Sequence, residues 1–278
     1  MKRRKPRDLG GIAAETPEAL FEMTLGRPAR KLADEIDLEF ESNPFRSFER
    51  RLLVATSGGR VGSHVLLQGL LNHGIKVNEY FNVDTISATC ARRGLATLED
   101  YCRFRLKRAA RGGAFGVKGK THILIPLWKS GEIPAHFDDW AIIYLYRRDV
   151  VRQAVSEVKA QITGSWRSAQ EPTREVTDED YDGPRIGKNI EKMMRAEKDW
   201  EDVFAVFGLS PMRIVYEELA AEPQAVIERA AAFANLTGQP LEQTTSPVEV
   251  QADALNERWT ARFRADYPDF DYGRGSPR

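Results

Sequence analysis

Residues 51–71 read RLLVATSGGRVGSHVLLQGLL, and this stretch decides the fold. Its apolar run over 52–55 is typical of a strand that is buried on both faces of a parallel sheet. Residues 56–63 are small, polar and rich in glycine, and apolar residues then recur at helical spacing. A strand, a glycine loop and a helix in this order predict a phosphate-binding site at the turn from the strand into the helix, which we call a corner. Backbone N–H groups and the helix dipole converge on an anion there.

We expect the glycine loop to hold an anion through its backbone and through one cation. Glycine lets the backbone approach a ligand closely, and Arg60 offers a guanidinium that suits phosphate or sulfate oxygens. A Walker A loop would need a lysine before its last Ser or Thr, whereas here Gly62 precedes Ser63. A tight turn without a ligand is the alternative. The residues expected to contact the ligand are Ser57, Gly58, Gly59, Arg60, Val61, Gly62, Ser63 and His64.

A second corner of the same kind follows residues 140–146, which form another apolar run. Arg147 and Arg148 come directly after it, and a helix predicted from about Val150 to Ile162 carries Ser156. Arginine forks and a short hydroxyl are groups that bind phosphate. Two anion sites at the ends of two strands indicate a ligand with two separated phosphates. The sequence leaves the choice between Arg147 and Arg148 open.

The two corners together resemble a known family. Residues 144–166, YLYRRDVVRQAVSEVKAQITGSW, are similar to the RxD…QAVS…TG.W pattern of bacterial carbohydrate sulfotransferases typified by trehalose 2-sulfotransferase, whose relatives act on lipopolysaccharide or nodulation factors. Weaker matches follow the same order at 78–81, 115–118 and 215–219. The resemblance implies an α/β fold, namely a P-loop-NTPase-like three-layer sandwich with a mostly parallel central sheet flanked by helices.

The resemblance also implies an activity and a role for each site residue. The donor would be 3′-phosphoadenosine-5′-phosphosulfate, and the acceptor a hydroxyl of a carbohydrate or glycolipid. The proposed general base maps onto Glu79, for which a surface or ion-paired acid is the alternative. Arg60 with the loop backbone would hold the 5′-phosphosulfate, and Arg147 or Arg148 with Ser156 would hold the 3′-phosphate. Relatives of this kind are often homodimers.

The chain departs from the family at the loop itself. The family usually reads TPRSGST, whereas here Ser57, Gly58 and Gly59 precede the arginine, so that the loop is about two residues longer. His64 replaces the final Thr, and Val77 stands where a Pro is usual two residues before the base. These differences bear on donor geometry and leave the fold unaffected.

The composition argues against several other classes of function. The 278 residues are 42% hydrophobic and 29% charged, with a formal net charge of zero, so no global field recruits nucleic acid or a membrane. No apolar run approaches the roughly 20 residues of a transmembrane helix, and the basic start MKRRKPRDLGG lacks the apolar segment of a signal peptide. A weak contact of that start with an anionic membrane surface is an alternative. With two cysteines and four scattered histidines, we expect a cytoplasmic protein without a metal.

We expect two parts of the chain and keep two rival functions. Residues 1–48 form a charged N-terminal extension, partly flexible, and residues 49–278 a single sulfotransferase-like α/β domain. Within it, the polar stretch from Arg167 to Arg185 is expected to be a long loop that acts as a lid or contacts the acceptor, with a disordered segment as the alternative. One rival is a P-loop nucleotide phosphotransferase or hydrolase, which would need Mg²⁺ and a lysine on the phosphates. The other is a non-catalytic descendant that binds nucleotide or sugar.

Overall fold

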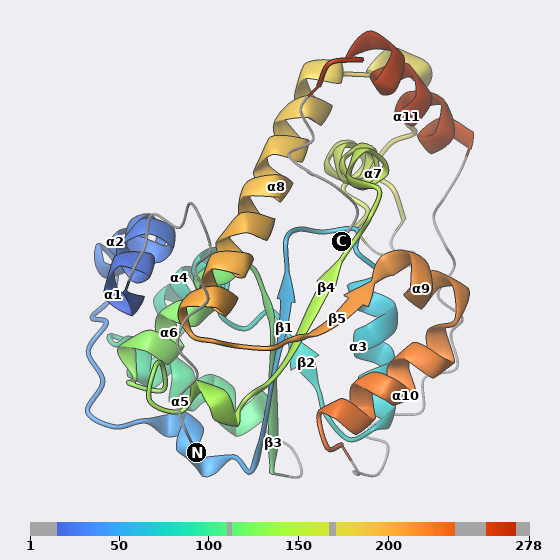
Figure 1. Cartoon of the computed structure of the whole chain (residues 1–278). Helices are drawn as coiled ribbons and strands as arrows, with labels where there is room; N and C mark the ends of the chain where they lie inside the picture. Colours follow the sequence, from blue (N-terminus) through green and yellow to red (C-terminus); the bar gives the residue numbers. More distant parts are fainter. Residues whose placement is uncertain (1–15, 110–112, 167–170, 237–253, 271–278) are drawn as a thin grey trace.

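The structure of the protein is a computed structural model that describes residues 16–109, 113–166, 171–236 and 254–270. The basic start of the predicted extension and residues 167–170 of the predicted polar loop lie outside these ranges. Figure 1 shows a central sheet with helices on both sides and two further helices beyond the carboxyl ends of the strands.

The sheet has five strands in the order β2-β3-β1-β4-β5. All pairings between the described strands are parallel, and the central strand β1 lies between β3 and β4. Parallel strands present their carboxyl ends at one edge, so the loops that follow β1 and β4 are neighbours. The bounds are β1 Arg50–Thr56, β2 Val77–Asn78, β3 Ala114–Gly119, β4 Ala141–Tyr146 and β5 Met212–Val215.

Alternation along β1 divides the core into two layers. Leu53 and Ala55 face one cluster of buried residues, whereas Leu52 and Val54 face the other. The strand is buried on both faces because its whole apolar run is covered, as predicted for 52–55. The second cluster lies under α3 (Ser63–Asn72), α9 (Tyr216–Ala221) and α10 (Pro223–Phe233).

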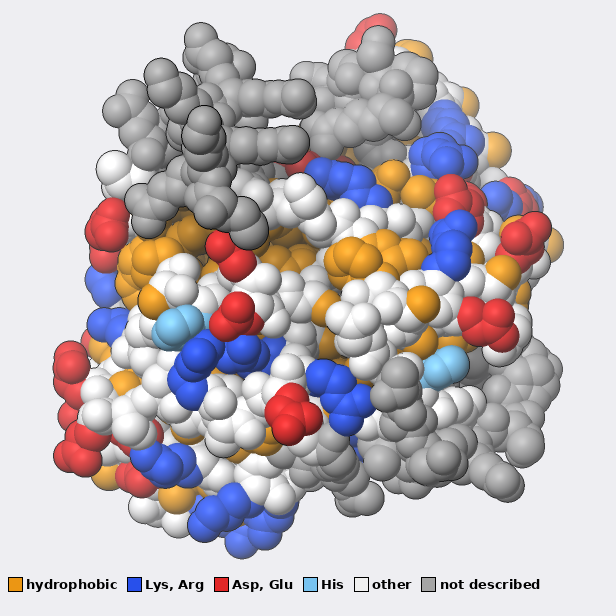
Figure 2. Space-filling model, turned by 60° about the horizontal axis from the view of Figure 1, so that its bottom comes forward, with side chains coloured by type: hydrophobic (Ala, Val, Ile, Leu, Met, Phe, Trp, Pro, Cys, Tyr) orange, Lys and Arg blue, Asp and Glu red, His pale blue; other side chains and the backbone are white. Residues whose placement is uncertain are grey.

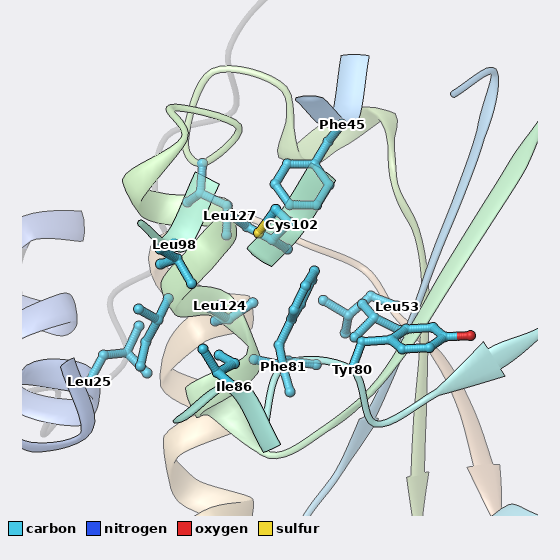
Figure 3. Packing of buried hydrophobic residues seen from close by; sticks show 14 of the residues in the cluster. Leu25, Phe45, Leu53, Tyr80, Phe81, Ile86, Leu98, Cys102, Leu124 and Leu127 are labelled. Atoms are coloured by element: carbon cyan, nitrogen blue, oxygen red, sulfur yellow. The ribbon is translucent and has the colours of Figure 1, made fainter. Parts of the chain in front are cut away.

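Helices α4, α5, α6 and the C-terminal part of α8 cover the first cluster (Figure 1). Figure 3 shows Phe45 and Phe81 inside it, and their ring centroids lie 5.8 Å apart in an edge-on arrangement. The bounds are α4 Val83–Arg93, α5 Leu98–Ala109, η3 Thr121–Ile123, α6 Leu124–Lys129, η4 Phe137–Asp139 and α8 Gly183–Val206. The predicted three-layer α/β sandwich of P-loop-NTPase type is thereby confirmed, with strand, glycine loop and helix at its centre.

The described part of the N-terminal segment packs against this first cluster. Leu25, Leu32 and Phe45 are buried there, and Leu25 appears beside Leu98 and Ile86 in Figure 3. The segment contributes apolar area to the main core, which stabilises the fold by about 25 cal/mol per Å² removed from water. Its elements are α1 Pro17–Leu20, the π-helical turn η1 Phe21–Leu25, α2 Gly26–Ala33 and η2 Pro44–Ser47.

A third cluster lies beyond the carboxyl ends of the strands. Here α7 (Val150–Thr163) packs against α8 and α11 (Ala254–Asp266), with the turn η5 (Asp178–Asp180) nearby. The stripe predicted for α7 is buried among α8 and α11, and it includes Val151 and Val155. Asp149 caps the N-terminus of α7, and its carboxylate accepts a hydrogen bond from the Arg152 N–H at 3.0 Å.

The surface carries mixed charge. On the face in Figure 2, basic and acidic side chains are interspersed, in keeping with the zero net charge. Among the helices of the described ranges, none is both long and apolar enough to cross a membrane.

Candidate functional site

The glycine loop joins the central strand to α3 with a sharply turned backbone. Arg60 has a φ of 62° and Gly62 a φ of 75°, both in the left-handed region. Gly62 is the N-cap residue of α3 and brings no side chain to cap the first N–H groups of the helix. The start of α3 therefore presents backbone donors and the positive end of the helix dipole, as an anion site requires. Val61 is buried beneath the loop, and Ser63 and His64 form the first turn of α3.

Gly58 and Gly59 pack closely against α7, and Ser57 precedes them. The Ser57 hydroxyl oxygen is buried, and no partner for it is present among the described residues. A Cβ on Gly59 would lie 3.2 Å from Oε2 of Glu157, and the Gly59 carbonyl accepts a hydrogen bond from Gln153 Nε2 at 2.9 Å. The extra residues of this loop thus fit against α7 because they lack side chains.

The two predicted anion corners meet at Arg60. Its Nε donates to the Ser156 hydroxyl oxygen at 2.8 Å, and its guanidinium also donates to the Trp166 carbonyl at 3.0 Å. Ser156 is buried on the face of α7 that points to the loop. The residues expected to bind two phosphates are therefore within one hydrogen bond of each other.

Arg147 and Arg148 have different surroundings. Arg147 is buried, its guanidinium lies 4.3 Å from the centre of the Tyr216 ring, and it donates to the Arg60 carbonyl at 3.4 Å. Arg148 is exposed, and its backbone N–H donates to the Glu217 carboxylate at 3.1 Å. The strand end therefore turns Arg147 toward the glycine loop and Arg148 toward solvent.

Burial dominates the electrostatics of the two enclosed arginines. It lowers the pKa of Arg60, and the neighbouring charge of Arg147 adds to that effect. Burial also lowers the pKa of Arg147. Two guanidinium groups held close together away from water favour an anion between them, because an anion would offset both desolvation and mutual repulsion.

Glu79 follows the short edge strand β2 and is held by a lysine. Lys118, in β3, places Nζ 2.5 Å from the Glu79 carboxylate and also donates to the Ser63 hydroxyl oxygen at 3.1 Å. These two contacts connect the predicted base to the first residue of α3. The Glu79 side chain is 56% exposed.

A histidine and a second lysine complete this side of the site. Burial lowers the pKa of His122 to about 4, with a further contribution from the charge of Lys120, so the imidazole is neutral near pH 7. Burial also lowers the pKa of Lys120, and the charge of Lys192 on α8 acts in the same direction. In the described ranges, no three or more His, Cys, Asp or Glu side chains gather as metal ligands would.

Several residues at the site were not predicted from the sequence. Gln153 and Glu157 lie at positions i and i+4 of α7 and so share the face that packs on the glycine loop. Gln153, three residues before Ser156, could have been found from helical spacing, whereas Glu157 is adjacent to Ser156 and could not. The contacts of Trp166 and Tyr216 with the arginines join residues far apart in the sequence, so no local pattern signals them.

The residues present fit a bisphosphorylated nucleotide. Phosphate and sulfate oxygens accept hydrogen bonds from donors of the kind found here: the uncapped start of α3, the buried hydroxyl of Ser57, which has no partner among the residues described, and two enclosed guanidiniums. A carboxylate at the same sheet edge supplies an acceptor for a proton. The arrangement can hold an anionic group and place a hydroxyl group beside it.

Known proteins match parts of the chain. Residues 129–266 match the family described as Stf0 sulphotransferase. The trehalose 2-sulfotransferase of Mycobacterium tuberculosis (strain ATCC 35801 / TMC 107 / Erdman) is 31% identical over 127 residues, which are 45% of this chain and 46% of that protein. The trehalose 2-sulfotransferase of Mycolicibacterium smegmatis is 30% identical over 129 residues, 46% of this chain and 47% of the relative.

These matches span about half the length of each curated relative. Among solved structures, the sulfotransferase domain of the Synechococcus PCC 7002 olefin synthase aligns with a TM-score of 0.45 and 14% identity, covering 86% of this chain and 100% of that domain. The matched family segment contains Arg147 and Ser156, whereas the glycine loop and Glu79 precede it. The resemblance predicted from the sequence is confirmed: residues 129–266 match the Stf0 sulphotransferase family, and the two relatives that the chain resembles are trehalose 2-sulfotransferases.

Proposed function

We propose that the protein is a sulfotransferase that moves a sulfuryl group from 3′-phosphoadenosine-5′-phosphosulfate to a hydroxyl of a carbohydrate or glycolipid. The observation that supports the proposal is the contact between Arg60 and Ser156, which brings the glycine loop next to the segment that matches the family. The sugar acceptor is suggested by the two relatives, which are named trehalose 2-sulfotransferases.

The roles of the residues follow from their surroundings. Arg60 and the backbone of residues 57–64 would hold the 5′-phosphosulfate and stabilise charge on the leaving oxygen. Arg147 and Ser156 would hold the 3′-phosphate, and the burial of Arg147 beside Tyr216 favours it over Arg148. Glu79 would take the proton of the acceptor hydroxyl.

The reaction balances without a covalent enzyme intermediate. The acceptor oxygen forms a bond to sulfur while the bond between sulfur and the bridging oxygen of the donor breaks. The acceptor proton passes to Glu79, and adenosine 3′,5′-bisphosphate leaves. The division into an extension over 1–48 and a domain over 49–278, the cytoplasmic location, the homodimer and the absence of a metal stay predictions.

Calorimetry with adenosine 3′,5′-bisphosphate tests the donor site. We expect the wild type to bind, and Arg147→Ala to weaken binding at least about tenfold, because it removes a charged hydrogen-bond donor. Arg148→Ala is the matched control and should change affinity less than about twofold, since its side chain faces solvent. A wild type that does not bind the nucleotide would remove the donor assignment.

Activity tests separate the rival functions. Sulfuryl transfer to trehalose is the first assay, because trehalose is named for both relatives. Activity that a chelator abolishes would favour the P-loop phosphotransferase. Tight binding of adenosine 3′,5′-bisphosphate without transfer to any of a panel of glycans would favour the non-catalytic descendant.

A further inference from the structure

Lys118 stands between the predicted base and the predicted donor site. Its ammonium lies 2.5 Å from the Glu79 carboxylate and 3.1 Å from the Ser63 hydroxyl oxygen. The lysine side chain is 11% exposed, so its charge is largely withdrawn from water, whereas Glu79 is 56% exposed. An enclosed ammonium of this kind depends on nearby anions for its stability.

These contacts conflict with the role of Glu79 as a base. Oε1 of Glu79 accepts a bond from the Lys118 ammonium and is therefore occupied. An acceptor hydroxyl needs that carboxylate free and within hydrogen-bond distance. The ion pair in the structure therefore describes a site in which the base is held back.

The neighbouring anion site offers Lys118 a second partner. Ser63 opens α3, where the backbone N–H groups and the helix dipole attract negative charge. The glycine loop has no lysine of its own, unlike a Walker A loop. Lys118, from the neighbouring strand β3, already contacts the hydroxyl of Ser63 and so places a cation beside that anion site.

We propose that Lys118 exchanges partners when the donor binds. Without donor, it pairs with Glu79; with donor, it turns to the anionic group at the start of α3 and releases the carboxylate. This inference rests on the proposed function. Its consequence is that the acceptor hydroxyl meets a free base only when the donor is bound.

A double-mutant cycle measures the exchange through binding of adenosine 3′,5′-bisphosphate, without turnover. Glu79→Gln removes the competing anion, and we expect the nucleotide to bind about threefold to tenfold more tightly. Lys118→Met removes the cation, and binding should weaken about tenfold. In the Lys118→Met background, Glu79→Gln should change affinity less than about twofold, because no lysine remains to be released.

A nearby acid controls for the general loss of negative charge. Asp84 is exposed and pairs with Lys31 at 2.7 Å, so Asp84→Asn should change affinity less than about twofold. Thermal unfolding shows whether Lys118→Met is stable. If it is not, Lys118→Arg is the second variant: it keeps a cation, so Glu79→Gln should again tighten nucleotide binding in that background.

Two results would overturn the exchange while leaving the proposed function in place. One is that Glu79→Gln fails to tighten binding in the wild-type background. The other is that the tightening persists without Lys118, which would make it a general charge effect. A wild type that binds no nucleotide would instead remove the proposed function, and the exchange with it.

Discussion

Gly62 is the position where the shape of the glycine loop and the arginine site can be tested together. Its φ of 75° is strained for any residue with a Cβ, at about 1–2 kcal/mol. A Cβ there would lie 2.9 Å from Cδ2 of Tyr216 and 3.2 Å from Cδ2 of Leu219. Overpacking of this kind adds about 1–3 kcal/mol. Gly62→Ala should therefore reduce the free energy of unfolding by about 2–5 kcal/mol.

The displaced ring gives this substitution a second effect. The centre of the Tyr216 ring lies 4.3 Å from the guanidinium of Arg147, so displacing the ring changes the contact that positions this arginine. We expect binding of adenosine 3′,5′-bisphosphate to weaken about tenfold, which corresponds to about 1.4 kcal/mol. Thermal unfolding and calorimetry measure the two effects on the same protein. At roughly 2–4 °C per kcal/mol, the melting temperature should fall by about 4–20 °C.

Gly94 provides the matched control. It has a φ of 65° at the end of α4, and a Cβ there would meet no atom within 4 Å. Gly94→Ala should cost only the backbone strain, about 1–2 kcal/mol, and leave nucleotide binding unchanged. Equal losses of stability for Gly62→Ala and Gly94→Ala, together with equal affinity for the nucleotide, would refute the argument from the Tyr216 contact.

Three further predictions concern stability. The pKa of His122 is about 4 in the folded protein and 6.5 in the unfolded chain, so only the unfolded chain takes up this proton between pH 6.5 and pH 5. The free energy of unfolding measured with urea should therefore fall by about 2 kcal/mol over that range. His122→Asn should remove this pH dependence. Glu132 is fully buried and lies 2.8 Å from Arg51, so Glu132→Gln should cost about 3–5 kcal/mol in chemical denaturation, and a loss below 1 kcal/mol would contradict the buried ion pair. A Cβ on Gly69 would lie 2.4 Å from Cδ1 of Ile227, so Gly69→Ala should destabilise the protein by about 1–3 kcal/mol. Combined with Ile227→Ala, the loss of stability should be smaller than the sum of the two single losses, and full additivity would place the strain elsewhere.

The sequence alone determined the central strand, the glycine loop and the helix that follows it. The apolar run before Thr56, the glycines after it and the helical spacing beyond are local patterns, and each depends on backbone propensity and burial of neighbouring residues. The second strand and the helix that carries Ser156 were equally local, and the comparisons with known proteins support the family resemblance that residues 144–166 suggested. Such patterns identify elements and the types of side chain that they carry.

Only the tertiary structure decided how those side chains meet. Arg147 and Arg148 are adjacent in the sequence and chemically alike, and they differ because β4 pairs with β1 while Glu217 holds the backbone of Arg148. The ion pair of Lys118 with Glu79 joins two strand ends 39 positions apart through the pairing of β2 with β3. Contacts of this kind depend on strand order and on the direction in which each side chain leaves the backbone, and neither is encoded in a local pattern.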